Sequence, residues 1–109
     1  MRNVFFHKEI IMADLKHWLI VYDIRDEKRL VKVGKCMESY AWRVQKSVFE
    51  TDADERTIGQ LKRRLEAIIE SEDFVLFFNI CERDWQKQEK FGVGAGEHGK
   101  NPNDGFAIL

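Results

Sequence analysis

The chain has 109 residues, of which 44% are hydrophobic and 34% are charged, and its net charge at pH 7 is -1. This length and composition are typical of one soluble globular domain and exclude a two-domain organisation. Binding to nucleic acid would therefore need a local basic patch. Cys36 and Cys81 have no paired spacing, which fits a reducing cytoplasm and gives no zinc or disulfide signature. No apolar run reaches the length of a membrane span, and no secretory signal is visible, so we expect a cytoplasmic protein.

Residues 1–16 predict an N-terminal extension. They contain several apolar side chains but no clear helical or strand period. Met12 offers a second possible start of translation, directly before the first strong strand signal. The alternative is that this stretch forms a short extra strand or helix that packs on the domain.

Residues 18–24, WLIVYDI, predict a strand that is buried on both faces, because six of the seven residues are apolar. Asp23 lies near the end of this strand. Burying an unpaired carboxylate is costly, so Asp23 needs a cation, a hydrogen-bond partner or access to water. Two interpretations stay open: Asp23 caps the following helix, or it belongs to a metal-dependent site.

A helix is expected after Asp26, which is a suitable N-cap. Its apolar face carries Leu30, Val33 and Met37. Basic residues fall on the opposite face and its flank: Lys28, Arg29, Lys32 and Lys35. Such a face is usually only solvated, but its position after Asp23 makes phosphate contacts a second interpretation.

The second half of the predicted domain contains strand, helix and strand signals. Residues 42–51, WRVQKSVFET, predict either one long strand or two short strands with a bend near Lys46 and Ser47. A second helix is expected over about residues 55–71, and residues 74–80, FVLFFNI, predict another strand that is apolar on both faces.

The C-terminal part differs in composition from the rest. Residues 82–90 are polar except for Trp85, and residues 91–105 hold five of the seven glycines and the only proline. This predicts a flexible loop or linker. The last four residues, 106–109, are all apolar and predict a short docking strand used on a partner.

The order of elements predicts an α+β fold, a ferredoxin-like βαββαβ sandwich with both helices on one face of the sheet. We divide the chain into an extension (1–16), the ferredoxin-like domain (17–81) and a Gly-rich tail (82–109). Because the strands expected at residues 18–24 and 74–80 are apolar on both faces, the face without helices needs a cover. A homodimer packed through this open sheet face is the simplest solution.

The sequence resembles the CRISPR-associated protein two family. The resemblance rests on YDI at residues 22–24, a first helix rich in Lys and Arg, and RVQKSVFE at residues 43–50. It covers about residues 18–80 and implies a small ferredoxin-like homodimer that works with the CRISPR integrase in spacer acquisition. It also implies a magnesium-dependent endonuclease acting on RNA or DNA, with Asp23 of both subunits as the catalytic and metal-binding residue.

Other positions match the family motif: Arg29, Arg43, Ser47 and Phe49. We expect sequence-independent nucleic-acid binding through Lys28, Arg29, Lys32 and Arg43. The sequence departs from the family in its last core strand, which is almost entirely apolar here, and in its two ends, to which no family role is transferred. C-terminal strands of family members often dock on the neighbouring subunit or on the integrase.

Three functions are compatible with this pattern. The first is a metal-dependent phosphodiesterase that uses Asp23, since Mg²⁺ can be held by one or two carboxylates together with waters and substrate phosphate. The second is a non-catalytic DNA-binding scaffold that bridges integrase dimers. The third is a stand-alone, toxin-like ribonuclease of similar fold. Asp26 and Glu50 are further carboxylates nearby in sequence, and we do not assign them as ligands.

Overall fold

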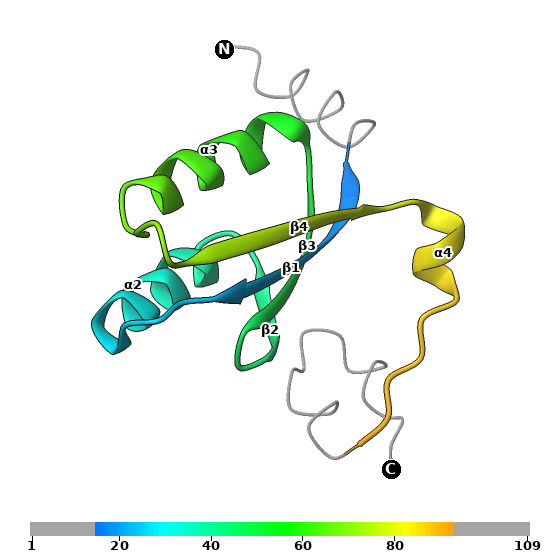
Figure 1. Cartoon of the computed structure of the whole chain (residues 1–109). Coiled ribbons are helices and arrows are strands. Elements are labelled where there is room, and N and C mark those ends of the chain that lie inside the picture. Colours follow the sequence, from blue (N-terminus) through cyan, green and yellow to red (C-terminus); the bar gives the residue numbers. More distant parts are fainter. Residues whose placement is uncertain (1–14, 93–109) are drawn as a thin grey trace.

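The computed structural model describes residues 15–92, which form a four-stranded antiparallel sheet with two long helices on one face (Figure 1). The strands lie in the order β2-β3-β1-β4, which is the βαββαβ ferredoxin-like arrangement expected from the sequence. The elements in chain order are β1 (Lys16–Asp23), α2 (Glu27–Glu38), β2 (Trp42–Gln45), β3 (Val48–Ala53), α3 (Glu55–Glu66), β4 (Phe74–Ile80) and α4 (Glu82–Gln86).

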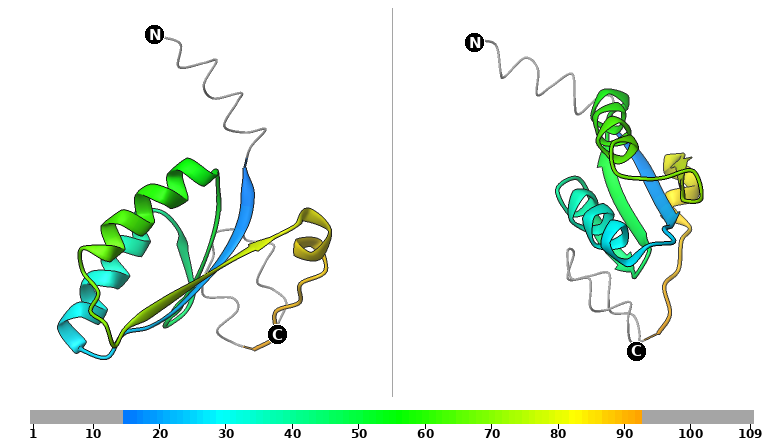
Figure 2. Two further views of the ribbon diagram at one scale, coloured as in Figure 1. Left: turned by 45° about the horizontal axis from the view of Figure 1, so that its top comes forward. Right: turned by 60° about the vertical axis from the view of Figure 1, so that its left-hand side comes forward.

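Figure 2 shows α2 and α3 together on one side of the sheet, while the short helix α4 lies on the other side. Three features expected from the sequence fall wholly or mostly outside the described residues: the N-terminal extension with its second start at Met12, the Gly-rich loop, and the docking strand at 106–109. Within residues 15–92, no helix is long and apolar enough to cross a membrane.

The core lies between the sheet and the two long helices. Alternate residues of β1 point into it, and Trp18, Ile20 and Tyr22 are all at most 5% exposed. The remaining side chains of this core that are less than 3% exposed are Val33, Met37, Phe49, Ile58, Leu61 and Leu65. Each such burial contributes about 1.5–3 kcal/mol. The helix-facing half of the fold is therefore a complete hydrophobic core.

Both long helices begin at an aspartate. The Asp26 carboxylate accepts a hydrogen bond from the Arg29 backbone N–H at 3.0 Å, and Asp54 accepts one from the Thr57 N–H at 2.8 Å. These bonds satisfy amide groups that a helix N-terminus leaves free. The predicted cap at Asp26 is confirmed.

The second helix is shorter than the sequence suggested. We expected it to continue to about residue 71, but α3 ends at Glu66. The backbone N–H groups of Ile68 and Ile69 both turn back to the Leu65 carbonyl, and the Glu70 N–H bonds to the Asp73 carboxylate instead of a helical carbonyl. The apolar stripe extended past the helix because Ile68 and Ile69 still pack against the core from this turn.

Residues 42–51 fold as two strands, which is the second of the two arrangements considered. The chain turns at Lys46 and Ser47, and β2 pairs with β3 through an irregular register between Arg43 and Gln45. Two side chains hold the turn in place. The Lys46 carbonyl accepts hydrogen bonds from the Tyr22 hydroxyl of β1 at 3.1 Å and from Arg43 Nη1 of β2 at 2.6 Å.

Asp73 ties three parts of the chain together just before β4. Its buried carboxylate accepts hydrogen bonds from the backbone N–H groups of Arg25 and Glu70 and from Arg29 Nε at 2.7 Å. The hydrogen bond from the Arg29 guanidinium holds the pKa of the Asp73 carboxyl well below its usual range. This contact fixes the turn that follows β1, and with it the place where Asp23 ends the strand.

Candidate functional site

The face of the sheet opposite α2 and α3 carries a row of exposed apolar side chains. On β4, Phe74, Leu76 and Phe78 are 46%, 44% and 46% exposed. Because directly opposed residues in an antiparallel pair share a face, the register places Leu19 and Val21 of β1 beside this row. We call these five residues the open-face patch. Contiguous exposed apolar surface of this kind marks an interaction site in a soluble protein.

Asp23 lies at one end of the open-face patch. It is directly opposite Phe74 in the β1–β4 pairing, and its side chain is exposed. Within residues 15–92, no hydrogen bond or ion pair reaches its carboxylate. The interpretation of Asp23 as the helix cap is therefore wrong: two residues separate it from Asp26, which makes the capping bond.

A single chain brings one free carboxylate to this place. Asp26 is engaged as a cap, and Glu50, on β3, is paired with Lys90 at 3.1 Å and is only 5% exposed. In the described part of the chain, no group of three or more His, Cys, Asp or Glu side chains is arranged to hold a metal ion. An exposed carboxylate is an oxygen ligand of the kind that Mg²⁺ prefers.

The basic residues proposed from the sequence fall into two groups. Lys28 and Lys32 are exposed on α2. Arg29 instead pairs with Asp73 and with Glu72 at 2.9 Å, and these hydrogen bonds raise the pKa of its guanidinium above the usual value. We therefore assign to Arg29 primarily a structural role.

The remaining motif positions build the β2–β3 hairpin. The Arg43 guanidinium lies over the Phe49 ring at 4.7 Å and pairs with Glu38 at 3.1 Å, while Phe49 itself is fully buried. Ser47 lies in the turn, where its carbonyl accepts the Tyr22 N–H. The register puts Arg43 and Phe49 on the helix-facing side of the sheet, opposite to Asp23, so the structure does not bring these motif residues together with it.

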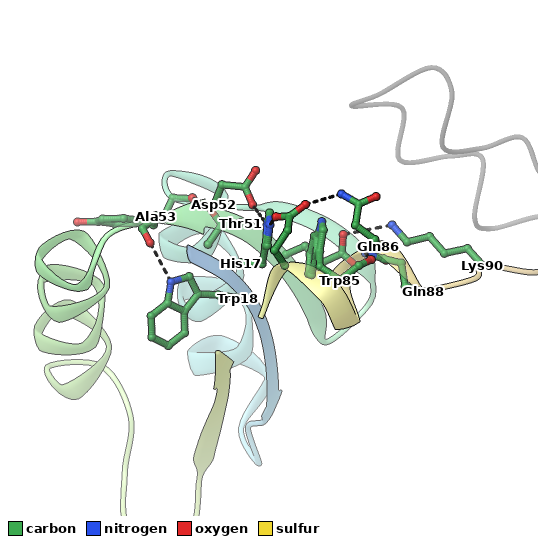
Figure 3. A network of polar contacts seen from close by, with 12 residues as sticks. His17, Trp18, Thr51, Asp52, Ala53, Trp85, Gln86, Gln88 and Lys90 are labelled. Atoms are coloured by element: carbon green, nitrogen blue, oxygen red, sulfur yellow. Dashed lines mark hydrogen bonds and ion pairs between the residues drawn. The ribbon is translucent and has the colours of Figure 1, made fainter. Parts of the chain in front are cut away.

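The sequence analysis missed a polar cluster at the other end of the open face. His17, on β1, contacts Asp52 through Nδ1 at 2.6 Å and Glu82 through Nε2 at 2.5 Å (Figure 3). The Trp85 ring of α4 stacks on the His17 ring with 4.5 Å between centroids. The signal in the sequence was Trp85 itself, the one large apolar residue in a polar segment.

The fold and the open face define a small ferredoxin-like protein with a free carboxylate at the end of its first strand. The family model described as CRISPR associated protein Cas2 matches residues 16–88. Since this match covers more than half of the chain, the protein belongs to the CRISPR associated protein Cas2 family. The resemblance drawn from the YDI and RVQKSVFE motifs is confirmed.

Individual relatives agree with this placement. The chain is 41% identical over 68 residues to the CRISPR-associated endoribonuclease Cas2 4 of Rhodospirillum rubrum, a match that covers 62% of this chain and 55% of that protein. It is 34% identical over 79 residues to the CRISPR-associated endoribonuclease Cas2 1 of Chloroflexus aurantiacus, covering 71% of this chain and 85% of that one.

A solved structure supports the fold independently. The crystal structure of Streptococcus pyogenes Cas2 superposes with a TM-score of 0.62 at 32% identity, over 70% of this chain and 99% of that chain.

The two aspartates at the end of β1 and the start of α2 are expected to differ in their effect on stability. Asp23→Ala should change the free energy of unfolding by less than about 0.5 kcal/mol, because the Asp23 carboxylate makes no hydrogen bond or ion pair within residues 15–92. Asp26→Ala should lower it by about 1 kcal/mol, because the variant has no side chain that can cap α2. Urea unfolding of both variants checks this, and an Asp23→Ala protein destabilised as much as Asp26→Ala would show that Asp23 has a structural role.

Proposed function

We propose that the protein is a magnesium-dependent, endonuclease-like homodimer that acts on or binds RNA or DNA phosphodiesters during CRISPR adaptation. The observation that carries this proposal is the free, exposed Asp23 carboxylate at the end of an exposed apolar patch, in a chain of the Cas2 family. The names of relatives, endoribonucleases in Rhodospirillum rubrum and Chloroflexus aurantiacus and an endonuclease in Thermus thermophilus, support a nuclease activity.

A second copy of the chain is the proposed cover of the open-face patch. Two sheets that pack face to face remove the exposed parts of Phe74, Leu76 and Phe78 from water in both copies at once. A two-fold axis through this contact makes the same patch meet itself, which is the usual geometry of a homodimer. Asp23 directly opposes Phe74 at one end of the patch, and we place the two-fold axis near this end, so that the Asp23 carboxylates of the two copies face one another.

The proposed chemistry follows from this pairing. Two carboxylates that approach closely repel one another unless a cation lies between them. A bound Mg²⁺ supplies charge stabilisation for the phosphate and a more acidic water. In the proposed dimer, the two Asp23 side chains would hold the ion. Lys28 and Lys32 would contact phosphates, and the exposed part of Arg43, which lies on the other side of the sheet from Asp23, would contact phosphates away from the ion. Holding nucleic acid and positioning one cation are the tasks that the proposal gives to this chain's residues.

A non-catalytic scaffold that bridges dimers of the CRISPR integrase is the second candidate. The observation that favours it is that, in the described residues, no group of three or more His, Cys, Asp or Glu side chains is arranged to hold a metal ion. The same dimer and the same basic residues would then serve to hold duplex nucleic acid.

We expect sedimentation velocity at micromolar concentration to give twice the chain mass. Leu76→Glu should give the single-chain mass, because it places a charge in the centre of the open-face patch. Val31→Glu is the matched control, since Val31 is 57% exposed but lies on α2, away from the open face. A wild-type monomer, or a Leu76→Glu dimer, would contradict the proposed interface.

Cleavage of RNA or DNA is expected to need Mg²⁺ and Asp23. The activity of Asp23→Ala should fall to the level measured in EDTA, because the variant lacks the Asp23 carboxylates that are proposed to hold the metal ion. Glu27→Ala removes an exposed carboxylate from the first turn of α2 and should keep wild-type activity. An active Asp23→Ala protein would rule out the catalytic role, and a wild-type dimer that binds nucleic acid without cutting it would favour the scaffold.

Nucleic-acid binding is expected to be independent of sequence and to weaken steeply with salt, because binding to phosphates releases counterions. Replacing both Lys28 and Lys32 with Gln should reduce the slope of log affinity against log salt by about 2 for each subunit that contacts the nucleic acid, or about 1 for each phosphate that the variant no longer binds. Fluorescence anisotropy at several salt concentrations measures the slope. An unchanged slope would place the phosphate contacts elsewhere on the protein.

A further inference from the structure

The segment that follows β4 folds back over the open face. Glu82 begins α4 directly after β4, and its side chain bonds to His17 on β1. Further along, Lys90 pairs with Glu50 of β3 at 3.1 Å. Since α4 lies on the side of the sheet away from α2 and α3 (Figure 2), residues 82–90 cover the end of the open face that is farthest from Asp23.

His17 is the centre of this contact. It is directly opposite Asp52 in the β1–β3 pairing and opposite Ile80 in the β1–β4 pairing. The charged groups that face its ring are Asp52 from β3 and Glu82 from α4; β4 contributes the apolar Ile80, and Trp85 covers the ring face. Nearby, Gln86 donates to the second oxygen of the Glu82 carboxylate, and Lys90 is engaged by Glu50.

The Asp52 and Glu82 carboxylates require that the His17 ring is protonated on both nitrogens. A neutral imidazole carries one N–H group, whereas the imidazolium carries two. Each ring nitrogen of His17 faces a carboxylate oxygen, so both nitrogens must donate for both contacts to be hydrogen bonds. Loss of the proton leaves a nitrogen lone pair against a negative oxygen, and one of the two contacts becomes repulsive.

The helix α4 cannot compensate for that loss. It has five residues, no side-chain cap and no buried residue, and so short a helix is not stable in water on its own. Within residues 15–92, its side-chain attachment to the sheet consists of the His17 contacts, the Trp85 stack and the more distant Lys90–Glu50 pair. The attachment of the segment is therefore coupled to one proton.

We propose that His17 is a proton-operated latch, which holds residues 82–90 on the open face as an imidazolium and releases them as a neutral imidazole. The latch is a property of the single chain. Its consequence for the homodimer rests on the proposed function: release uncovers the end of the open face that includes His17 and Ile80, and enlarges the surface available to a second copy.

Glu82 and Asp52 determine how the stabilising effect of protonated His17 depends on pH. Partial burial lowers the pKa of His17, but the hydrogen bonds and charges of Glu82 and Asp52 outweigh burial and raise the pKa above its usual value of 6.5. The hydrogen bond from His17 lowers the pKa of Glu82 below its usual value of 4.5. Because the folded pKa of His17 is raised, its stabilising effect is complete below 6.5 and is lost as the pH rises through the raised value. On the acid side the effect is lost as the pH falls through the lowered pKa of Glu82.

The test is NMR spectroscopy of the full chain. We expect the His17 ring resonances to titrate with a pKa above 6.5. The protection factors of the Trp85 and Lys87 amides in α4 should fall by at least about tenfold between about pH 5.5 and about pH 8.5. Protection factors correct for the intrinsic effect of pH on exchange, and the amides of α3 serve as the internal reference.

Variants separate the latch from other titrations. His17→Phe keeps an aromatic ring for Trp85 but no proton, so its α4 protection should be low and independent of pH. The double variant His7→Gln, His98→Gln removes the only other histidines of the chain and should behave as wild type. Glu82→Gln keeps the side-chain length but not the charge, and should lower the His17 pKa.

Two results would overturn the proposal: a His17 pKa at or below 6.5, or α4 protection that keeps the wild-type pH dependence in His17→Phe. The Leu76→Glu variant repeats the experiment without the proposed dimer interface. If the wild type is monomeric, the proposed dimer fails. If Leu76→Glu still shows the pH-dependent α4 protection, the latch stands, so the two failures can be told apart.

Discussion

The structure depends on one constraint: its sheet has two apolar faces, and its long helices cover only one of them. Strands β1 and β4 carry apolar side chains on two faces, but α2 and α3 cover only one face of the sheet. The covered face, with Trp18, Ile20 and Phe49, forms a core that is complete within the chain. The other face leaves Phe74, Leu76 and Phe78 nearly half exposed. Apolar area that one chain cannot bury is a driving force for association, and the candidate site lies on this face.

The structural contacts near the end of β1 are made by residues other than Asp23. The structural tasks near the end of β1 are performed by neighbours: Asp26 caps α2, and Asp73 binds the Arg25 N–H and the Arg29 guanidinium. Asp23 is thereby left with no partner among the described residues, although it is only three residues from the cap. A carboxylate that makes no hydrogen bond or ion pair within residues 15–92 is available for a ligand or for a second copy.

The fold could be predicted from the sequence because its signals are local. The runs WLIVYDI and FVLFFNI, the cap at Asp26 and the helical stripes were enough for the βαββαβ order. The end of α3 was missed, because Ile68 and Ile69 continue the apolar stripe although the chain has already turned. Whether residues 42–51 form one strand or two depended on the Lys46 carbonyl, whose partners Tyr22 and Arg43 could not be paired with it from the sequence.

The site was predictable only in part. Asp23 was singled out because an acid in an apolar strand is conspicuous. That Asp26 and not Asp23 caps α2 depends on the folded turn between them. The structural contacts of Arg29 join distant parts of the chain, since Arg29 and Asp73 are 44 positions apart, and the charge pattern of one helix does not reveal them. The His17 cluster unites β1, β3 and α4 in the same way. Such contacts join segments that are far apart in the sequence, and the local pattern of each segment does not show which distant segment it meets.

The proposed homodimer requires that a second copy covers the open face and that the two Asp23 carboxylates share one cation. X-ray diffraction from crystals of the full chain grown with Mn²⁺ is the decisive test, because the anomalous signal locates the metal. We expect an anomalous peak between the Asp23 side chains of two copies whose open faces are packed together. A structure in which the open faces do not meet, or in which the metal binds away from Asp23, would contradict this proposal.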